Sequence, residues 1–147
     1  MGLDMYLTGK RRFYKEKCDA LDEVSEKWCG GRDITWLTFE LGYWRKANAI
    51  HGWFVNNVQG GKDDCDEYEV RYSDLVKLRQ LCKEVLDNGE EYALRFLPPA
   101  SGFFYGTTDI DEYYWQYVKS TYELLTDLCM DEDIQSGNMY VYYQSSW

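Results

Sequence analysis

None of the short motifs that identify common enzyme classes occurs in this sequence. There is no glycine-rich phosphate loop, no dinucleotide-binding fingerprint, no nucleophile elbow and no HExxH zinc motif. Histidine occurs once, as His51, and the five cysteines form no CxxC pair. Because a zinc site needs several His or Cys ligands at suitable spacing, we expect no metal and no other cofactor. The protein is therefore expected not to be an enzyme, although a small-molecule reaction that uses His51 stays open as a third hypothesis.

Long apolar runs are absent too. No stretch approaches the roughly 18 apolar residues that a membrane span requires, and the first residues do not form a secretory signal. An odd number of cysteines without such a signal is typical of reduced thiols in a cytosol. We expect a cytosolic protein that has no membrane partner.

Basic residues are in the minority, and the net charge is −10. This balance disfavours direct binding to nucleic acid. The acids are unevenly placed, since residues 107–135 contain eight Asp and Glu against Lys119 alone. Either a solvated helix face or a surface that binds a basic protein through Asp109–Asp133 explains this pattern. The acidic run Asp63–Glu69 lacks the central glycine and the twelfth-position glutamate of a calcium loop, so we expect a solvated loop.

The length of 147 residues is that of one domain, residues 1–147, and no linker or repeat divides it. Alternating polar and apolar residues predict strands at Leu3–Leu7, Tyr68–Tyr72 and Met139–Gln144, and the two terminal strands are placed to pair. Apolar residues spaced by three and four predict main helices at Glu40–Val58, Asp74–Asp87 and Ile110–Met130. Ile34–Phe39 is a strand or the approach to the first of these helices. The predicted fold class is α+β, with a small antiparallel sheet of terminal and short internal strands and about three helices packed on it.

The central segment Glu40–Val58 (ELGYWRKANAIHGWFVNNV) is the most informative stretch. Its apolar spacing predicts a helix that is buried on one side, at Trp44, Ala47, Ile50, Phe54 and Val58. Polar residues lie between these positions and on the opposite face, namely Arg45, Asn48, His51 and Asn56. Gly52 within a helix marks the close approach of a neighbouring helix, of another backbone or of a ligand.

A second informative stretch is the loop LRFLPPASGFFYGTTD, in which two prolines prevent a helix. Phe103, Phe104 and Tyr105 stand between two glycines, and three adjacent rings cannot all face one core. A long loop of this kind is often functional, and Trp115 follows near the beginning of the last helix. The alternative is a short strand over Gly102–Gly106 that is packed on both sides.

Three segments together carry a family resemblance: MGLDMYL at the start, ELGYWRKANAIHGWFV in the middle, and GFFYG followed by DEYYW. With these segments the chain resembles a family of small, functionally uncharacterised proteins of bacteriophages and prophages. The resemblance implies an accessory protein in the host bacterial cytoplasm and no known activity. Such accessory proteins often counter host defence, by inhibiting a host protein or by sequestering a nucleotide signal.

Aromatic faces combined with Arg, Asn and His are the groups that stack on a base and bind its edges or a phosphate. We therefore expect a small anionic or nucleotide-like ligand. Arg45 and His51 are predicted to hold the anion, and Asn48 and Asn56 to bond polar edges. The predicted stacking and closing residues are Trp44, Phe104 and Trp115, together with the loop residues Phe103 and Tyr105. The alternative hypothesis is an inhibitor that binds a basic host protein through the acidic segment.

Overall fold

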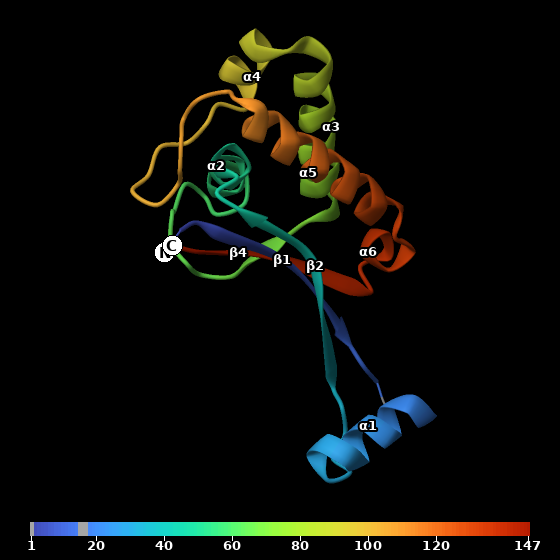
Figure 1. Ribbon diagram of the computed structural model, residues 1–147. Helices are drawn as coiled ribbons and strands as arrows, with labels where there is room; N and C mark the ends of the chain where they lie inside the picture. The colour runs from blue at the N-terminus through green and yellow to red at the C-terminus, as the bar shows by residue number, and fades with distance from the viewer. Residues whose placement is uncertain (1, 15–17) are drawn as a thin grey trace.

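The protein is described here by a computed structural model, which covers residues 2–14 and 18–147 (Figure 1). Four strands form one antiparallel sheet in the order β2-β1-β4-β3. Their bounds are β1 Asp4–Arg12, β2 Trp36–Arg45, β3 Tyr68–Val70 and β4 Met139–Ser146. The predicted pairing of the two ends of the chain is confirmed, because β1 and β4 run side by side from Asp4 opposite Ser146 to Arg11 opposite Met139.

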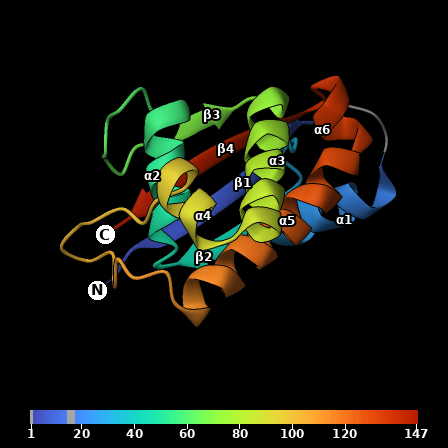
Figure 2. The same ribbon diagram turned by 90° about the horizontal axis from the view of Figure 1, so that it is seen from above.

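Helices cover one face of this sheet, so the predicted α+β fold class is confirmed (Figures 1 and 2). The helices are α1 Asp19–Cys29, α2 Asn48–Asn57, α3 Tyr72–Asn88, α4 Glu90–Phe96, α5 Glu112–Met130 and α6 Glu132–Ser136. Alternate residues of the central strands point toward the helices and are buried, as Met5 and Leu7 of β1 and Tyr143 of β4 show. The Tyr143 ring stacks on Phe54 of α2, with 3.9 Å between the ring centroids.

The helix predicted over Glu40–Val58 is wrong in its first part. Residues up to Arg45 belong to β2, which pairs with β1, and the helix begins only at Asn48. Trp44 and Phe54 are buried as predicted, but the spacing between them crosses a change of direction in the chain. That change occurs at Lys46, which directly follows the strand and has a left-handed backbone conformation, with a φ of 54°. Pairing along a full neighbouring strand outweighed the local helical pattern.

The outer part of the β1–β2 ribbon leaves the body of the protein and carries α1 at its end (Figure 1). We call the described residues 12–14 and 18–36 the arm, because Lys10 and Arg11 still pair with β4. Within α1 only Ser25 is buried, and Trp28 is 74% exposed. The inner part of β2 is held by α5 instead, since a Cβ at Gly42 would lie 2.5 Å from a methyl carbon of Leu124.

Candidate functional site

The structure does not bring the predicted site residues into one pocket. Four of them are buried, with exposed fractions of 5% or less for Trp44, Asn48 and His51 and of 6% for Tyr105. The others are Arg45, Asn56 and Phe103, which are exposed, and Phe104 and Trp115, which are half-buried. Arg45 is thus the one predicted charged residue that solvent reaches freely.

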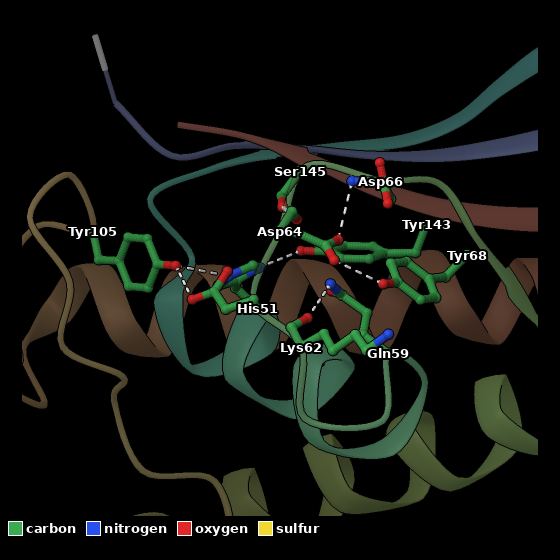
Figure 3. Close-up of polar contacts among 10 residues, drawn as sticks. His51, Gln59, Lys62, Asp64, Asp66, Tyr68, Tyr105, Tyr143 and Ser145 are labelled. Carbon is green, nitrogen blue, oxygen red and sulfur yellow. Dashed lines mark hydrogen bonds and ion pairs between the residues drawn. The ribbon is translucent and has the colours of Figure 1, made fainter.

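His51 lies at the centre of a buried polar cluster (Figure 3). Its Nδ1 is 2.7 Å from Tyr143 Oη, and its Nε2 is 3.0 Å from both Asp63 Oδ1 and Tyr105 Oη. Tyr105 also donates its hydroxyl hydrogen to Asp63. Both ring nitrogens therefore have partners from three other segments, and a substrate can reach neither of them while the cluster is closed. The cluster joins α2 and β4 to the acidic run Asp63–Glu69 and to the loop that contains Tyr105.

Burial controls the protonation of this cluster. It lowers the pKa of His51, and the neighbouring Asp63 carboxylate opposes that shift. Burial also raises the pKa of Tyr143 and of Tyr105, and in Tyr105 the hydrogen bond to Asp63 adds to the effect. At neutral pH the cluster therefore holds a neutral imidazole and two neutral phenols. Asp63 has the predicted solvent exposure, with its side chain 38% exposed, and it also bonds to this network.

Stability is expected to fall as the pH drops from about 7 to about 5, because the pKa of His51 is lower in the folded protein than its unfolded value of about 6.5. In this window the unfolded chain binds a proton that the folded chain does not, so the free energy of unfolding decreases. Urea unfolding at several pH values measures the slope. His51 is the only histidine, so the variant His51→Gln should lose this part of the slope. Equal slopes in both proteins would contradict the assignment.

Asn48 fastens the aromatic loop, which we define as residues 98–107. Its Nδ2 donates to the carbonyls of Tyr105 at 3.0 Å and Thr107 at 2.8 Å, and its Oδ1 accepts from the N–H of Ala100 at 3.2 Å. This buried amide therefore makes three of its four possible hydrogen bonds inside the protein, and one lone pair of Oδ1 is left over. The predicted role of Asn48 in bonding a ligand is therefore replaced by a structural one.

Of the three adjacent rings in the aromatic loop, only Tyr105 belongs to the buried core. Phe103 is 94% exposed and Phe104 packs edge-on against it, with centroids 4.8 Å apart. The alternative of a short strand over Gly102–Gly106 is wrong, since these residues form a turn. The loop also explains Gly52, where a Cβ would lie 3.1 Å from the Cβ of Ala100. The close neighbour of this glycine is thus the loop and not another helix.

The remaining predicted residues are dispersed. Trp44 donates its indole N–H to Thr121 Oγ1 of α5 at 2.8 Å, so its ring is part of the core. Trp115 packs against Tyr114 on the same helix. Asn56 borders a separate hollow of about 190 Å³ between α2 and Pro98–Ala100. Trp44 lines a depression together with Arg45, whereas His51, Asn56 and Trp115 do not line it.

What the structure does form is a groove at the corner between β2 and α2. A depression of about 290 Å³ is lined by Tyr43, Trp44, Arg45, Ala47, Tyr113, Gln116, Tyr117 and Ser120. A second one of about 180 Å³ adjoins it at Tyr113 and Tyr117 and adds Lys46, Asn48, Gly106, Thr107, Asp109, Asp111 and Tyr114, so the predicted residue Asn48 also borders the groove. We call the two together the corner groove. Of the described residues that line its larger half, Arg45 alone is charged.

Backbone contacts fix the corner that presents the two cations. The N–H of Lys46 donates to the carbonyl of Leu3 at 2.7 Å, and the N–H of Leu3 donates to the carbonyl of Phe104 at 3.2 Å. Tyr113 donates its hydroxyl to the carbonyl of Arg45. Gly106, with a φ of 87°, lets the aromatic loop turn beside the Lys46 side chain. The corner is therefore held by β1, α5 and the loop at once.

Arg45 is the group of the groove that is best placed to hold an anion. Opposite it on β1 lies Asp4, but the Asp4 carboxylate accepts the hydroxyl of Tyr43. This hydrogen bond is the main reason why the pKa of Tyr43 is raised. Among residues 2–14 and 18–147, Arg45 and Lys46 have no carboxylate within 4.0 Å. A free guanidinium beside tyrosine rings binds phosphate or carboxylate groups well.

Sequence reasoning missed several contributors, namely Tyr43, Lys46, Asp63, Tyr113, Tyr117 and Tyr143. Three of them had a usable signal in the sequence. Lys46 directly follows Arg45, and Tyr113 precedes Tyr117 by four residues, which places both rings on one side of a helix. Asp63 and Tyr143 are separated from His51 by 12 and 92 residues, and nothing local in the sequence links them.

The acidic segment Asp109–Asp133 is only partly free. Asp111 and Asp131 cap α5 and α6 by accepting backbone N–H groups, and Asp133 pairs with Arg11 at 2.7 Å. Glu112 and Asp127 on α5 are exposed. The binding of a basic host protein by this segment stays a prediction.

No protein-family model, curated protein or solved structure matches this chain. The resemblance to phage proteins therefore stays a prediction. In the described part of the chain, no helix has both the length and the hydropathy of a membrane span. The same residues include no group of three or more His, Cys, Asp and Glu side chains suited to a metal ion.

Proposed function

We propose that the protein is a phage accessory protein of the host bacterial cytoplasm that binds a small anionic or nucleotide-like ligand in the corner groove, without catalysing a reaction. The observation that carries this proposal is the exposed Arg45 guanidinium, which has no carboxylate within 4.0 Å in the described chain and shares a depression with Tyr43 and Tyr113. The guanidinium can bind two oxygens of a phosphate at once. The tyrosine rings offer faces for a planar base.

Size and shape support a compact ligand. The two halves of the groove, about 290 and 180 Å³, together reach the lower range of small-molecule sites. The phosphate end belongs beside Arg45, in the half without carboxylates, because Asp109 and Asp111 line the other half. Lys46 stands in that second half and adds a second cation near the junction.

The buried residues contribute through preorganisation. Trp44 is held by Thr121, and Asn48 holds the aromatic loop. Arg45 and Lys46 lie between these two anchors. Their backbone is therefore already ordered and loses little conformational entropy when a ligand binds. By sequestering a nucleotide signal in this groove, the protein would counter a host defence that depends on the signal.

Replacing Arg45 with alanine is expected to weaken ligand binding about 10- to 150-fold, because a charge-assisted hydrogen bond contributes about 1.5–3 kcal/mol. Isothermal titration calorimetry with inorganic phosphate and with the nucleoside monophosphates measures the loss. Arg45 is exposed, so the free energy of unfolding should stay within about 1 kcal/mol of the parent value.

Arg95→Ala is the matched control, because Arg95 is an exposed arginine on α4 that lies over the Phe96 ring. It removes the same charge from a different part of the surface and should leave affinity unchanged. Equal affinity of Arg45→Ala and the parent protein would show that the groove is not the site. Unfolding of Arg45→Ala would instead make Arg45 a structural residue.

A further inference from the structure

Strand β2 is the outermost strand of the sheet and is paired on one side only. Its inner end is covered, because Tyr113 donates to the carbonyl of Arg45 and Leu124 lies against Gly42. Its outer half, Trp36–Glu40, pairs with Thr8–Arg12 of β1, and all of its residues except Leu37 are exposed. An uncovered strand edge presents a row of backbone donors and acceptors to another strand.

The register identifies which backbone groups point outward. The N–H of Phe13 donates to the carbonyl of Thr35 at 2.8 Å, so these two residues form a hydrogen-bonded pair. Along an antiparallel ladder, hydrogen-bonded pairs alternate with pairs that exchange no hydrogen bonds. The next residues bonded to β1 are therefore Leu37 and Phe39, and the outward groups belong to Trp36, Thr38 and Glu40. The register shift that follows, opposite Leu7 and Thr8, ends this regular edge.

We propose that Trp36–Glu40 pairs antiparallel with the same segment of a second copy of the chain, about a two-fold axis at Thr38. Thr38 then faces Thr38 of the other copy, and Trp36 faces Glu40. All three outward residues exchange backbone hydrogen bonds, and the two four-stranded sheets become one. The paired segment is as long as an average strand.

The charges along the free edge of β2 favour a second copy of the chain as the partner strand. Glu40 is the only charged residue from Trp36 to Leu41, so the pairing brings no like charges face to face. On the sheet face without helices, Arg12 of β1 stands beside Trp36. The guanidinium of Arg12 lies over the Tyr14 ring in the single chain, and in the dimer its long side chain turns toward Glu40 of the other copy, so that the symmetric pair forms twice. Trp36 and Phe39, which are 48% and 41% exposed, become covered on the two faces.

A proline at Thr38 tests the backbone pairing. Thr38 points its N–H away from β1, so Thr38→Pro removes the outward donor and leaves the β1–β2 ladder intact. In sedimentation equilibrium at micromolar concentration, the parent protein should have twice the chain mass of 17.5 kDa. Thr38→Pro should have the mass of one chain. Circular dichroism of both proteins checks that the fold is retained.

Exchanging the charges of Arg12 and Glu40 tests whether the partner strand comes from a second copy of the chain. This test does not depend on the proline variant. Glu40→Arg and Arg12→Glu should each raise the dimer dissociation constant at least tenfold, and the double variant should restore it. Lys77→Glu, an exposed charge reversal on α3, should have no effect. A monomeric parent protein overturns the proposal and leaves the edge to a foreign strand. A dimer that survives Thr38→Pro, or a double variant that stays monomeric, overturns it as well.

Discussion

Replacing His51 with alanine is expected to lower the free energy of unfolding by about 3–5 kcal/mol, the upper range for single substitutions. The imidazole is fully buried, so its loss leaves a cavity between α2 and β4. The loss also removes the only partner that the structure gives the buried Tyr143 hydroxyl, and an unsatisfied buried hydroxyl costs about 1–3 kcal/mol. Urea unfolding followed by tryptophan fluorescence measures the change.

Asp63→Ala is the matched control for this prediction. Asp63 belongs to the same cluster, but its side chain is 38% exposed, so water replaces the lost contacts and the decrease should be less than half as large. A loss of under about 1 kcal/mol in His51→Ala would mean that the cluster does not hold the four segments together. Comparable losses in the two variants would place the key contact at Asp63 instead.

Replacing Asn48 with alanine is expected to cost about 2–4 kcal/mol and to free the aromatic loop. The substitution leaves two carbonyls and one N–H of the loop without their partner, in a place where the amide itself is 2% exposed. Limited proteolysis should then cut at Phe103–Tyr105 long before the rest of the chain. Denaturant unfolding gives the change in free energy.

Asn56→Ala is the control on the same helix, because Asn56 is exposed and borders the loop at Pro98–Ala100 without the hydrogen bonds that Asn48 makes. It should change stability by no more than about 0.5 kcal/mol. If Asn48→Ala and Asn56→Ala were equally mild and the loop equally resistant to protease, the buried amide would not be what fastens the loop.

The sequence allowed the fold class to be predicted because its signals were local. Leu3–Leu7 and Met139–Gln144 alternate as strands do, and Ile110–Met130 has the spacing of a helix. The segment before Asn48 was misassigned because Trp44 and Ala47 are both core residues at a helical spacing, although one ends a strand and the other precedes a helix. Only the pairing with β1 decides between the two, and that pairing involves residues about 40 positions away.

The site was harder to predict because a buried network and a ligand site use the same residue types. Asn48 and His51 stand among apolar residues, as binding residues do, yet their partners lie inside the protein. Those partners come from loops and strands distant in sequence, so local patterns do not reveal them. Arg45 was predicted as a polar residue of a helix face, but it is exposed because it ends strand β2. Tyr113 joins it only through the packing of α5 against β2.

An amide NMR titration tests the central claim, that the corner groove binds a small anion, most directly. Inorganic phosphate and the nucleoside monophosphates are added in turn to the isotope-labelled protein. If the groove binds these anions, we expect saturable shifts of the amides at Tyr43–Lys46 and Tyr113, with little change in α1 or α3. These shifts should be lost in Arg45→Ala. Saturable shifts confined to another part of the surface, or none with any of these anions at millimolar concentration, would contradict it.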